Sequence, residues 1–381
     1  ANFQLAFAIL NNRHFYEIPL SRGGHGEKVR SARVAVFAGF SALIQTPAQL
    51  RRLAQILVIT SVPVVILGLG QLFWGWATPA GWQGVSAALG CALAPGGNPS
   101  GRMASVFMYA NLLAGYLVIV FILSLGLLIE SFQKIGVRSQ KRGTTPYTLF
   151  LTVAVLGNFV ALILTNSRNA WAIAICAAIA FAIYQRWHWL MAGVGAIAGS
   201  ILLAAFGPAP LQQPLRQIVP SYFWQRLTDQ LYPNRPVVSL RTTQWHFAWN
   251  LTQQRPWTGW GLRNFQPLYE MQMHAWFGHP HSLYLMLTTE TGIPATLLFC
   301  GWVLWIFFQG VRLLLLKSSI NANERDRLIF FSYLVALFAC ILFNTVDVTI
   351  FDLRLNTVVW LVLSAIAGVV FHRGNTTLLQ K

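Results

Sequence analysis

Long apolar segments recur along the chain, and they constrain its fold more than any other feature. The segments are 33–47, 54–75, 103–130, 147–165, 170–185, 188–206, 291–316, 328–346 and 353–371. An apolar helix of roughly 20 residues crosses a bilayer because it satisfies its own backbone polar groups. The composition agrees, with 55% hydrophobic and only 10% charged residues. The sequence therefore predicts an all-α, polytopic transmembrane bundle of about nine or ten spans.

The chain begins at Ala1, already inside the apolar stretch 3–10. This stretch has neither the basic n-region nor the cleavage site of a signal peptide. We expect the natural N-terminus, with one or more helices, to precede Ala1.

The four cysteines predict no disulfide framework. Cys176, Cys300 and Cys340 fall within apolar segments, Cys91 stands alone in a loop, and the sequence has no CxxC pair. We therefore expect neither a structural disulfide nor a zinc site.

Basic residues occur mainly in alternate short loops. Those at 48–53, 131–146, 186–188, 317–327 and the C-terminus are basic, which predicts a cytoplasmic location. The loops at 76–102, 166–169, 207–290 and 347–352 then face outward. One basic segment, 11–32, disagrees with this alternation. Inside-positive loops and anionic headgroups account for the net charge of +17, so we expect a lipid bilayer as partner and no nucleic acid.

The one long polar stretch, 207–290, divides the chain into 1–206, 207–290 and 291–381. Arginines, tryptophans and tyrosines alternate through it, which suits a ligand with an anionic end and sugar rings. We predict short helices over 222–232 and 241–253 that lie across the outer mouth of the bundle, with Ser239 as the N-cap of the second.

Three residues on the predicted outward side could carry chemistry: Arg168, Arg241 and His281. Taken singly, they could be an arginine snorkelling to headgroups, part of a surface helix and a polar anchor. Together, two guanidinium groups could bind a pyrophosphate and an imidazole could take a proton from a hydroxyl. We expect all three to converge on one outward cavity. His279 and His281 form a His-x-His pair, but no acidic residue lies near it in sequence, so we predict no metal site.

The stretch from about 150 to 310 resembles the O-antigen ligase and Wzy-type polymerase family of the bacterial cell envelope. The motifs that carry the resemblance are Ser167-Arg168-Asn169-Ala170-Trp171, Arg241 with Trp245 and Ala248, Pro256-Trp257-Thr258-Gly259-Trp260-Gly261, His281-Ser282-Leu283-Tyr284-Leu285 and Glu290-Thr291-Gly292-Ile293-Pro294. The upstream stretch 102–107 with Asn111 is similar to another family segment. The family often has His-Asn where this chain has His281-Ser282.

The resemblance implies an inverting, metal-independent glycosyltransferase of the GT-C type without a cofactor. It would act on the periplasmic face of the inner membrane in polysaccharide or lipopolysaccharide biosynthesis. The donor would be a glycan on undecaprenyl pyrophosphate, and the acceptor a hydroxyl of lipid A-core or of a growing glycan. The family's essential residues, two arginines and a histidine, fall on Arg168, Arg241 and His281. We further expect substrate-binding roles for five residues: Arg102, Asn111, Trp245, His279 and Arg263.

Two other classes of function remain open. An anion transporter of the bicarbonate type could also use outward arginines, although a small anion does not need a platform of aromatic rings. A structural scaffold would not require the three candidate residues to cluster. The sequence does not separate a ligase from a polymerase, because the two share the donor and differ in the acceptor.

Overall fold

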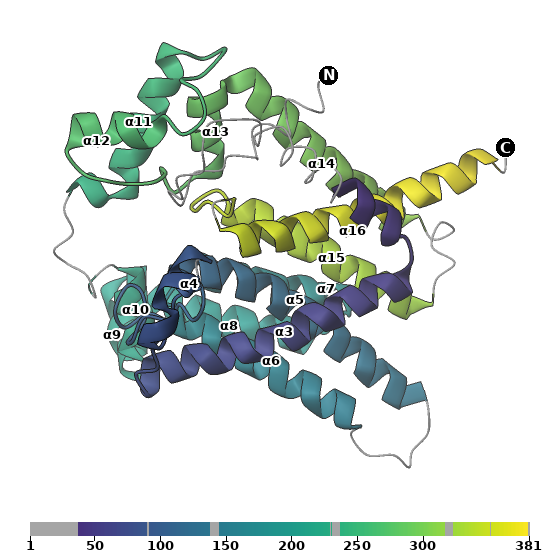
Figure 1. The fold of residues 1–381 in the computed structure, drawn as a ribbon. Helices are drawn as coiled ribbons and strands as arrows, with labels where there is room; N and C mark the ends of the chain where they lie inside the picture. Colours follow the sequence, from purple (N-terminus) through teal and green to yellow (C-terminus); the bar gives the residue numbers. More distant parts are fainter. Residues whose placement is uncertain are drawn as a thin grey trace.

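The computed structural model describes residues 37–89, 91–137, 145–228, 230, 237–316, 323–350 and 352–379. Within them, eight long helices run between the two ends of one bundle (Figure 1). These are α3 (Pro47–Phe73), α5 (Ala110–Val137), α6 (Pro146–Leu164), α7 (Arg168–Tyr184), α8 (His188–Phe206), α14 (Ile293–Leu315), α15 (Glu324–Phe343) and α16 (Leu353–Leu379). Seven of them are long and apolar enough to cross a membrane, and α7 is a shorter apolar helix. The protein is therefore an all-α, multi-pass membrane bundle, as predicted.

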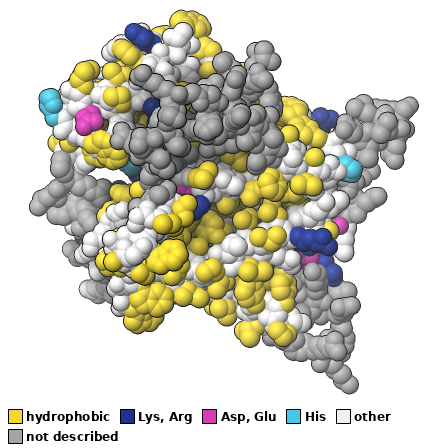
Figure 2. Space-filling model, viewed as in Figure 1, with side chains coloured by type: hydrophobic (Ala, Val, Ile, Leu, Met, Phe, Trp, Pro, Cys, Tyr) yellow, Lys and Arg dark blue, Asp and Glu magenta, His cyan; other side chains and the backbone are white. Residues whose placement is uncertain are grey.

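Helix α5 forms the centre of the bundle. It packs against α3, α6, α7 and α15, and most of its side chains are buried. Helix α8 lies at the edge, where it contacts α7 and leaves most of its side chains exposed. Hydrophobic side chains cover the face over α3 and α6, as expected for a surface in contact with lipid (Figure 2).

Three predicted span boundaries are wrong for identifiable reasons. Helix α3 begins at residue 47 rather than 54, because Thr46 and Gln49 form a capping box ahead of Pro47. Helix α5 begins at residue 110 rather than 103, because residues 103–109 form a turn, buried at its start over Met103 to Ser105. The predicted span 291–316 is broken at Gly292, whose φ of 82° ends α13 (Leu283–Thr291) and starts α14.

The first predicted span, 33–47, is only partly described: residues 37–43 are helical, and 33–36 lie outside the described residues. The basic segment 11–32 also lies outside them. At the end of the bundle where α3 begins, Arg51 pairs with Glu130 at 2.9 Å and with Asp326 at 2.5 Å. This is the end at which the sequence predicts the cytoplasmic loops.

The opposite end carries the short helices (Figure 1). They are η1 (Ala80–Trp82), α4 (Gln83–Ala88), α9 (Ala209–Ile218), α10 (Ser221–Leu227), η2 (Val237–Ser239), α11 (Arg241–Gln254), α12 (Phe265–Met273) and α13. Helix α11 confirms the predicted short helix over 241–253. Helix α10 confirms only the first part of the helix predicted over 222–232, because it ends at Leu227 and Thr228 and Gln230 lie in a turn, while 229 and 231–236 lie outside the described residues. The prediction of Ser239 as N-cap is wrong, because the preceding turn η2 includes Ser239 and Leu240 takes the cap position.

Candidate active site

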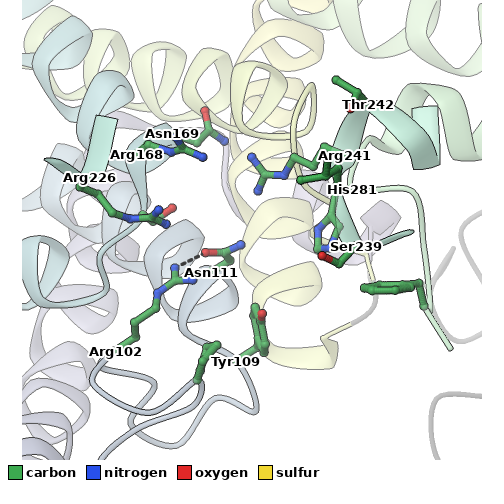
Figure 3. Close-up of a pocket in the computed structure, with 14 residues that line it drawn as sticks. Arg102, Tyr109, Asn111, Arg168, Asn169, Arg226, Ser239, Arg241, Thr242 and His281 are labelled. Atoms are coloured by element: carbon green, nitrogen blue, oxygen red, sulfur yellow. Dashed lines mark hydrogen bonds between the residues drawn. The ribbon is translucent and has the colours of Figure 1, made fainter. Parts of the chain in front are cut away.

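A polar cavity of about 460 Å³ opens at the end of the bundle that carries the short helices. Its wall combines residues that are far apart in the sequence: Pro99, Arg102, Tyr109, Asn111, Ser167, Arg168, Asn169, Arg226, Ser239, Leu240, Arg241, Thr242, Phe277 and His281. Figure 3 shows Arg168 and Arg226 on one side of the space, Arg241 and His281 on the other, and Arg102 with Asn111 below. The expected convergence of Arg168, Arg241 and His281 on one cavity is thus observed.

The turn between α6 and α7 sets the position of Arg168. Asn166 has a φ of +53°, a left-handed conformation that asparagine tolerates better than most residues. This conformation reverses the chain, so that Arg168 becomes the first residue of α7. Its NH1 donates to the carbonyl oxygen of Leu227 at 3.3 Å. Arg226 is buried and donates from Nε to the carbonyl oxygen of Asn166 at 3.1 Å, which connects α10 to the turn.

Arg102 and Asn111 form the floor of the cavity through a chain of hydrogen bonds. Arg102 donates from Nε to the carbonyl oxygen of Thr165 at 2.8 Å and from NH2 to Oδ1 of Asn111 at 2.5 Å. Asn111 in turn donates from Nδ2 to Oδ2 of Asp347 at 2.8 Å. Asn111 lies in the first turn of α5, the central helix. These hydrogen bonds therefore attach the loop that contains Arg102 to α5.

Helices α11 and α13 hold Arg241 and His281 on the opposite side. Thr289 donates from Oγ1 to the carbonyl oxygen of Ala248 at 2.9 Å and joins the two helices. Arg241 is the first residue of α11, and His281 lies immediately before Ser282, the N-cap of α13. The Ser282 side chain accepts from the Leu285 amide, the capping role that serine and asparagine share. The departure from His-Asn to His-Ser therefore keeps this cap.

The buried carboxylate of Asp347 connects both halves of the site. Its Oδ1 lies 3.6 Å from Nδ1 of His281, and its Oδ2 lies 3.8 Å from NH2 of Arg241. These distances exceed hydrogen-bond length but allow strong attraction in a buried site. Asp347 also accepts from the Val348 amide at 2.9 Å and from Asn111. One carboxylate thus contacts the floor, the arginine and the histidine.

Two pKa values in this cluster are displaced from their ordinary range. Burial alone would raise the pKa of Asp347, but His281, His279 and Arg241 outweigh burial and lower the pKa to about 2. Burial, together with the neighbouring His281 and Arg241, lowers the pKa of His279 to about 3 against the opposing effect of Asp347. Near pH 7, Asp347 is therefore an anion and His279 is neutral.

Nδ1 of His279 accepts a hydrogen bond from the His281 amide at 3.1 Å. A neutral imidazole that accepts at Nδ1 carries its proton on Nε2. His279 therefore supports the backbone at His281, whose φ is +48°. The two rings also meet edge to face, with centroids 4.5 Å apart.

The ligand atoms of His279, His281 and Asp347 lie within 4.8 Å of one another, a grouping that could hold a metal ion. The premise that no acidic residue lies near the histidine pair holds in sequence but is wrong in the fold. Other features of the cluster still disfavour a cation there. Nδ1 of His279 is already used, and the Arg241 guanidinium is close to the same carboxylate.

Of the five residues expected to bind substrate, Arg102 and Asn111 line the cavity, whereas Trp245, His279 and Arg263 are not among its lining residues. The His279 ring contacts the His281 ring edge to face. Arg263 lies near the buried Glu290, where burial lowers the pKa of Arg263 and Glu290 opposes that effect. Trp245 is on α11, one turn after Arg241.

The stretches 256–261 and 290–294, two of the motifs that carry the family resemblance, have a structural explanation. The Gly261 amide donates to the Glu290 carbonyl oxygen at 2.9 Å, and the Ile293 amide donates to the Pro256 carbonyl oxygen at 2.7 Å. A Cβ on Gly259 would lie 2.5 Å from the Glu290 carbonyl carbon, so only glycine allows this approach. These stretches hold the end of α13 in place and thereby support His281.

Sequence reasoning missed Asp347 and gave Arg226 no role at the site. Asp347 lies in the loop 347–352, which the charge pattern had placed on the outward side, and few acidic residues occur in the outward loops. The scarcity of acidic residues in these loops could have identified Asp347 as a candidate site residue. Arg226 was one of six arginines in 207–290, and nothing in the sequence distinguished it from the others.

Comparison with known protein families gives a match to this chain. Residues 150–300 match the model of the family described as O-antigen ligase. The match covers the stretch with Arg168, Arg226, Arg241 and His281, and it confirms the resemblance noted in the sequence. No curated protein sequence matches the chain closely enough to be compared with it.

Proposed function

We propose that this protein is a membrane glycosyltransferase of the O-antigen ligase type, which moves a glycan from a lipid pyrophosphate to an acceptor hydroxyl. The observation that carries the proposal is the arrangement around the cavity: four arginines and one histidine backed by a buried carboxylate. Four guanidinium groups and one carboxylate give the site a net positive charge, which matches a pyrophosphate. The donor would be a glycan on undecaprenyl pyrophosphate, and the cavity would face the periplasm.

His281 would act as the general base. Its Nδ1 faces Asp347, so a proton on Nδ1 leaves the lone pair of Nε2 for the acceptor hydroxyl. Asp347 then stabilises the imidazolium that forms. His279 would support this arrangement, because its Nδ1 accepts a hydrogen bond from the His281 amide.

The reaction is a single displacement. The acceptor oxygen forms a bond to the anomeric carbon while the bond from that carbon to the pyrophosphate oxygen breaks. The hydroxyl proton passes to His281, and the leaving oxygens gain negative charge that Arg168 and Arg241 stabilise. Attack opposite to the leaving group inverts the anomeric centre. Fixed cations at the leaving group act mainly in the transition state, where one preorganised donor contributes roughly 10²–10³ in rate.

The test is transfer in vitro from a glycan on undecaprenyl pyrophosphate with purified variants. We expect His281→Ala to lose transfer by about 10²–10⁴-fold while donor binding remains. Arg168→Lys should also be strongly impaired, because a point charge does not replace the planar fork of a guanidinium. His246→Ala is a matched control, since His246 is exposed on α11 and does not line the cavity. Full transfer by His281→Ala would overturn the proposal.

The acceptor defines the biological role. Lipid A-core as acceptor would make the protein a ligase, and a growing glycan would make it a polymerase. In cells without the protein, accumulation of lipid-linked single repeat units indicates a polymerase, whereas accumulation of lipid-linked long chains indicates a ligase. Anion uptake by the protein in liposomes, without transfer, would instead support a transporter.

A further inference from the structure

A small lobe follows α3, made of residues 74–89 and 91–93, and it contains η1 and α4. Its two ends are bonded to each other. The Thr78 amide donates to the Leu93 carbonyl oxygen at 3.1 Å, and the Leu93 amide donates to Oγ1 of Thr78 at 2.7 Å. This 74–93 lobe is therefore a closed element of the fold and not an extended connection.

The lobe is attached to the last turn of α3. The Trp76 amide donates to the Gly70 carbonyl oxygen at 3.0 Å, and Gln71 donates from Nε2 to the Ala94 carbonyl oxygen at 2.8 Å. A Cβ on Gly70 would overlap the Trp76 ring, so the ring packs directly on the backbone of α3. Gly70 and Gln71 lie inside the apolar span Pro47–Phe73. The lobe therefore lies level with the end of a membrane-spanning helix.

The surface of the lobe is apolar and carries no charge. Its large exposed hydrophobic side chains are Trp74, Trp76, Trp82, Val85 and Leu89. No Asp, Glu, Lys, Arg or His occurs between residues 53 and 101. The exposed apolar side chains of α3 continue this surface: Ile56, Ile59, Ile66 and Phe73. The rings of Phe73 and Trp74 meet edge to face with centroids 6.4 Å apart, so the two surfaces join without a polar break.

We propose that the 74–93 lobe inserts into the membrane surface at the cavity end of the bundle, with its tryptophans as anchors. Continuity with the apolar face of a membrane-spanning helix makes lipid the occupant of this surface. Tryptophan suits the boundary between headgroups and chains, because indole combines an apolar ring with one N–H donor. The inference does not depend on the proposed function, since it rests on the surface of the lobe and its attachment to α3.

Two physical limits fix how the lobe is inserted. Irregular backbone exposed to lipid does not occur within the hydrocarbon region, so the lobe lies at the headgroup boundary and not deeper. An apolar surface at this boundary is typically buried by ~5–10 Å. Because the lobe has no basic residue, its insertion should depend on apolar area and not on anionic lipid.

Insertion of the lobe would also set the position of the cavity floor relative to the membrane. Oε1 of Gln71 accepts from the Ala104 amide at 3.1 Å and from the Ser105 amide at 2.7 Å. These residues closely follow Arg102, which lines the cavity. The glutamine that is bonded to Ala94 beside the lobe thus also holds the loop of Arg102.

The test measures the depth of a nitroxide at Val85 in the full chain, reconstituted in phospholipid nanodiscs. The four native cysteines are replaced by alanine, and Val85→Cys is labelled. Electron paramagnetic resonance compares relaxation by oxygen, which concentrates in hydrocarbon, with relaxation by a water-soluble nickel chelate. We expect a depth of ~5–10 Å below the headgroup boundary, equal in phosphatidylcholine and in mixtures with phosphatidylglycerol.

Two further labelled positions calibrate the measurement. Ile197→Cys, on the exposed surface of the span α8, should report hydrocarbon. His246→Cys, exposed on α11, should report water. A Val85 label that matches His246→Cys would overturn the proposal and leave the surface to a protein partner. A Val85 label that enters the membrane only with anionic lipid would also overturn it.

A pair of matched variants tests whether the tryptophans anchor the lobe. Trp82→Asp places a charge on its surface, so the Val85 label should move toward the water reference. Trp257→Asp makes the same change at an exposed tryptophan outside the lobe and should leave the depth unchanged. An equal effect of both variants, or no effect of Trp82→Asp, would contradict insertion through the lobe. The depth at Val85 with the tryptophans intact decides the proposal even if Trp82→Asp does not fold.

Discussion

Oδ1 of Asp347 lies 3.6 Å from Nδ1 of His281, although the two residues come from loops that are distant in the sequence. Asp347 follows α15, and His281 precedes α13. The Leu283 amide donates to the Asn344 carbonyl oxygen at 3.0 Å and holds the two loops together. The general base proposed for the reaction therefore depends on a carboxylate from another loop.

Replacement of that carboxylate should impair the chemical step. Asp347→Asn keeps the shape but removes the charge that faces His281 and Arg241, so we expect kcat to fall by roughly 10²–10⁴-fold with a smaller change in donor KM. Steady-state kinetics with purified protein measure this. Asp326→Asn, at the opposite end of the bundle, is the control. Equal activity in wild type and Asp347→Asn would show that the carboxylate does not assist the base.

Arg226 should contribute to donor binding. Its side chain is buried, lines the cavity and holds the turn that precedes Arg168. Hydrogen bonds to charged groups contribute about 1.5–3 kcal/mol, so Arg226→Ala should raise donor KM by roughly 10–100-fold. Arg216→Ala is a matched control, because Arg216 lies over Trp224 in the same polar segment, 207–290, without lining the cavity. A donor KM equal to that of wild type would contradict a role for Arg226.

Glu290 should make stability depend on pH. Burial raises the pKa of Glu290 to about 7, despite the opposing effects of the Arg263 and Phe265 amides and the Arg263 charge. The folded state therefore holds a proton that the unfolded state releases near pH 4.5. The contribution of Glu290 to stability is greatest at low pH and falls as pH rises toward 7, by an amount on the order of 1–3 kcal/mol.

Glu290→Gln keeps an acceptor and cannot ionise, so its thermal midpoint should change less than that of wild type between pH 5 and 8. Thermal unfolding in detergent at several pH values measures the difference. A steeper pH dependence in Glu290→Gln than in wild type would mean that another group governs the slope.

Gly259 should tolerate no side chain. Its φ of +64° disfavours other residues, and an added Cβ would lie 2.5 Å from the Glu290 carbonyl carbon. We expect Gly259→Ala to destabilise the protein by about 1–3 kcal/mol and to lower activity through displacement of α13. Gly75→Ala separates the effect of a positive φ from the effect of the clash, since Gly75 has a φ of +65° with no atom near its Cβ position. Similar unfolding midpoints for the two variants would exclude the clash.

Metal should not be required. The Arg241 guanidinium beside Asp347 opposes a cation at the His279–His281–Asp347 grouping. Transfer should be unchanged after treatment with EDTA and dialysis. Loss of activity in EDTA, with recovery on addition of a divalent ion, would assign the grouping as a metal site.

The sequence by itself determined the class of fold and the residues of highest chemical interest. Apolar segments of membrane-spanning length dictate helices, because a helix alone satisfies its backbone in lipid. The alternation of basic loops separated the two ends of the bundle, and Arg168, Arg241 and His281 were found as an arginine–arginine–histidine set on one of them. Apolar segments, basic loops and short motifs each lie within a few neighbouring residues, so they can be identified from the sequence alone.

Only the tertiary structure decided which side chains meet. Asp347 reaches His281 because α13 is bonded to the end of α15, and Arg226 enters the cavity because it is bonded to the turn before α7. Residues 103–109 leave the helix for a similar reason: the Ala104 and Ser105 amides bond to Gln71 from α3. Each of these contacts joins distant segments, and a local pattern of residues carries no information about a partner that packing alone brings near.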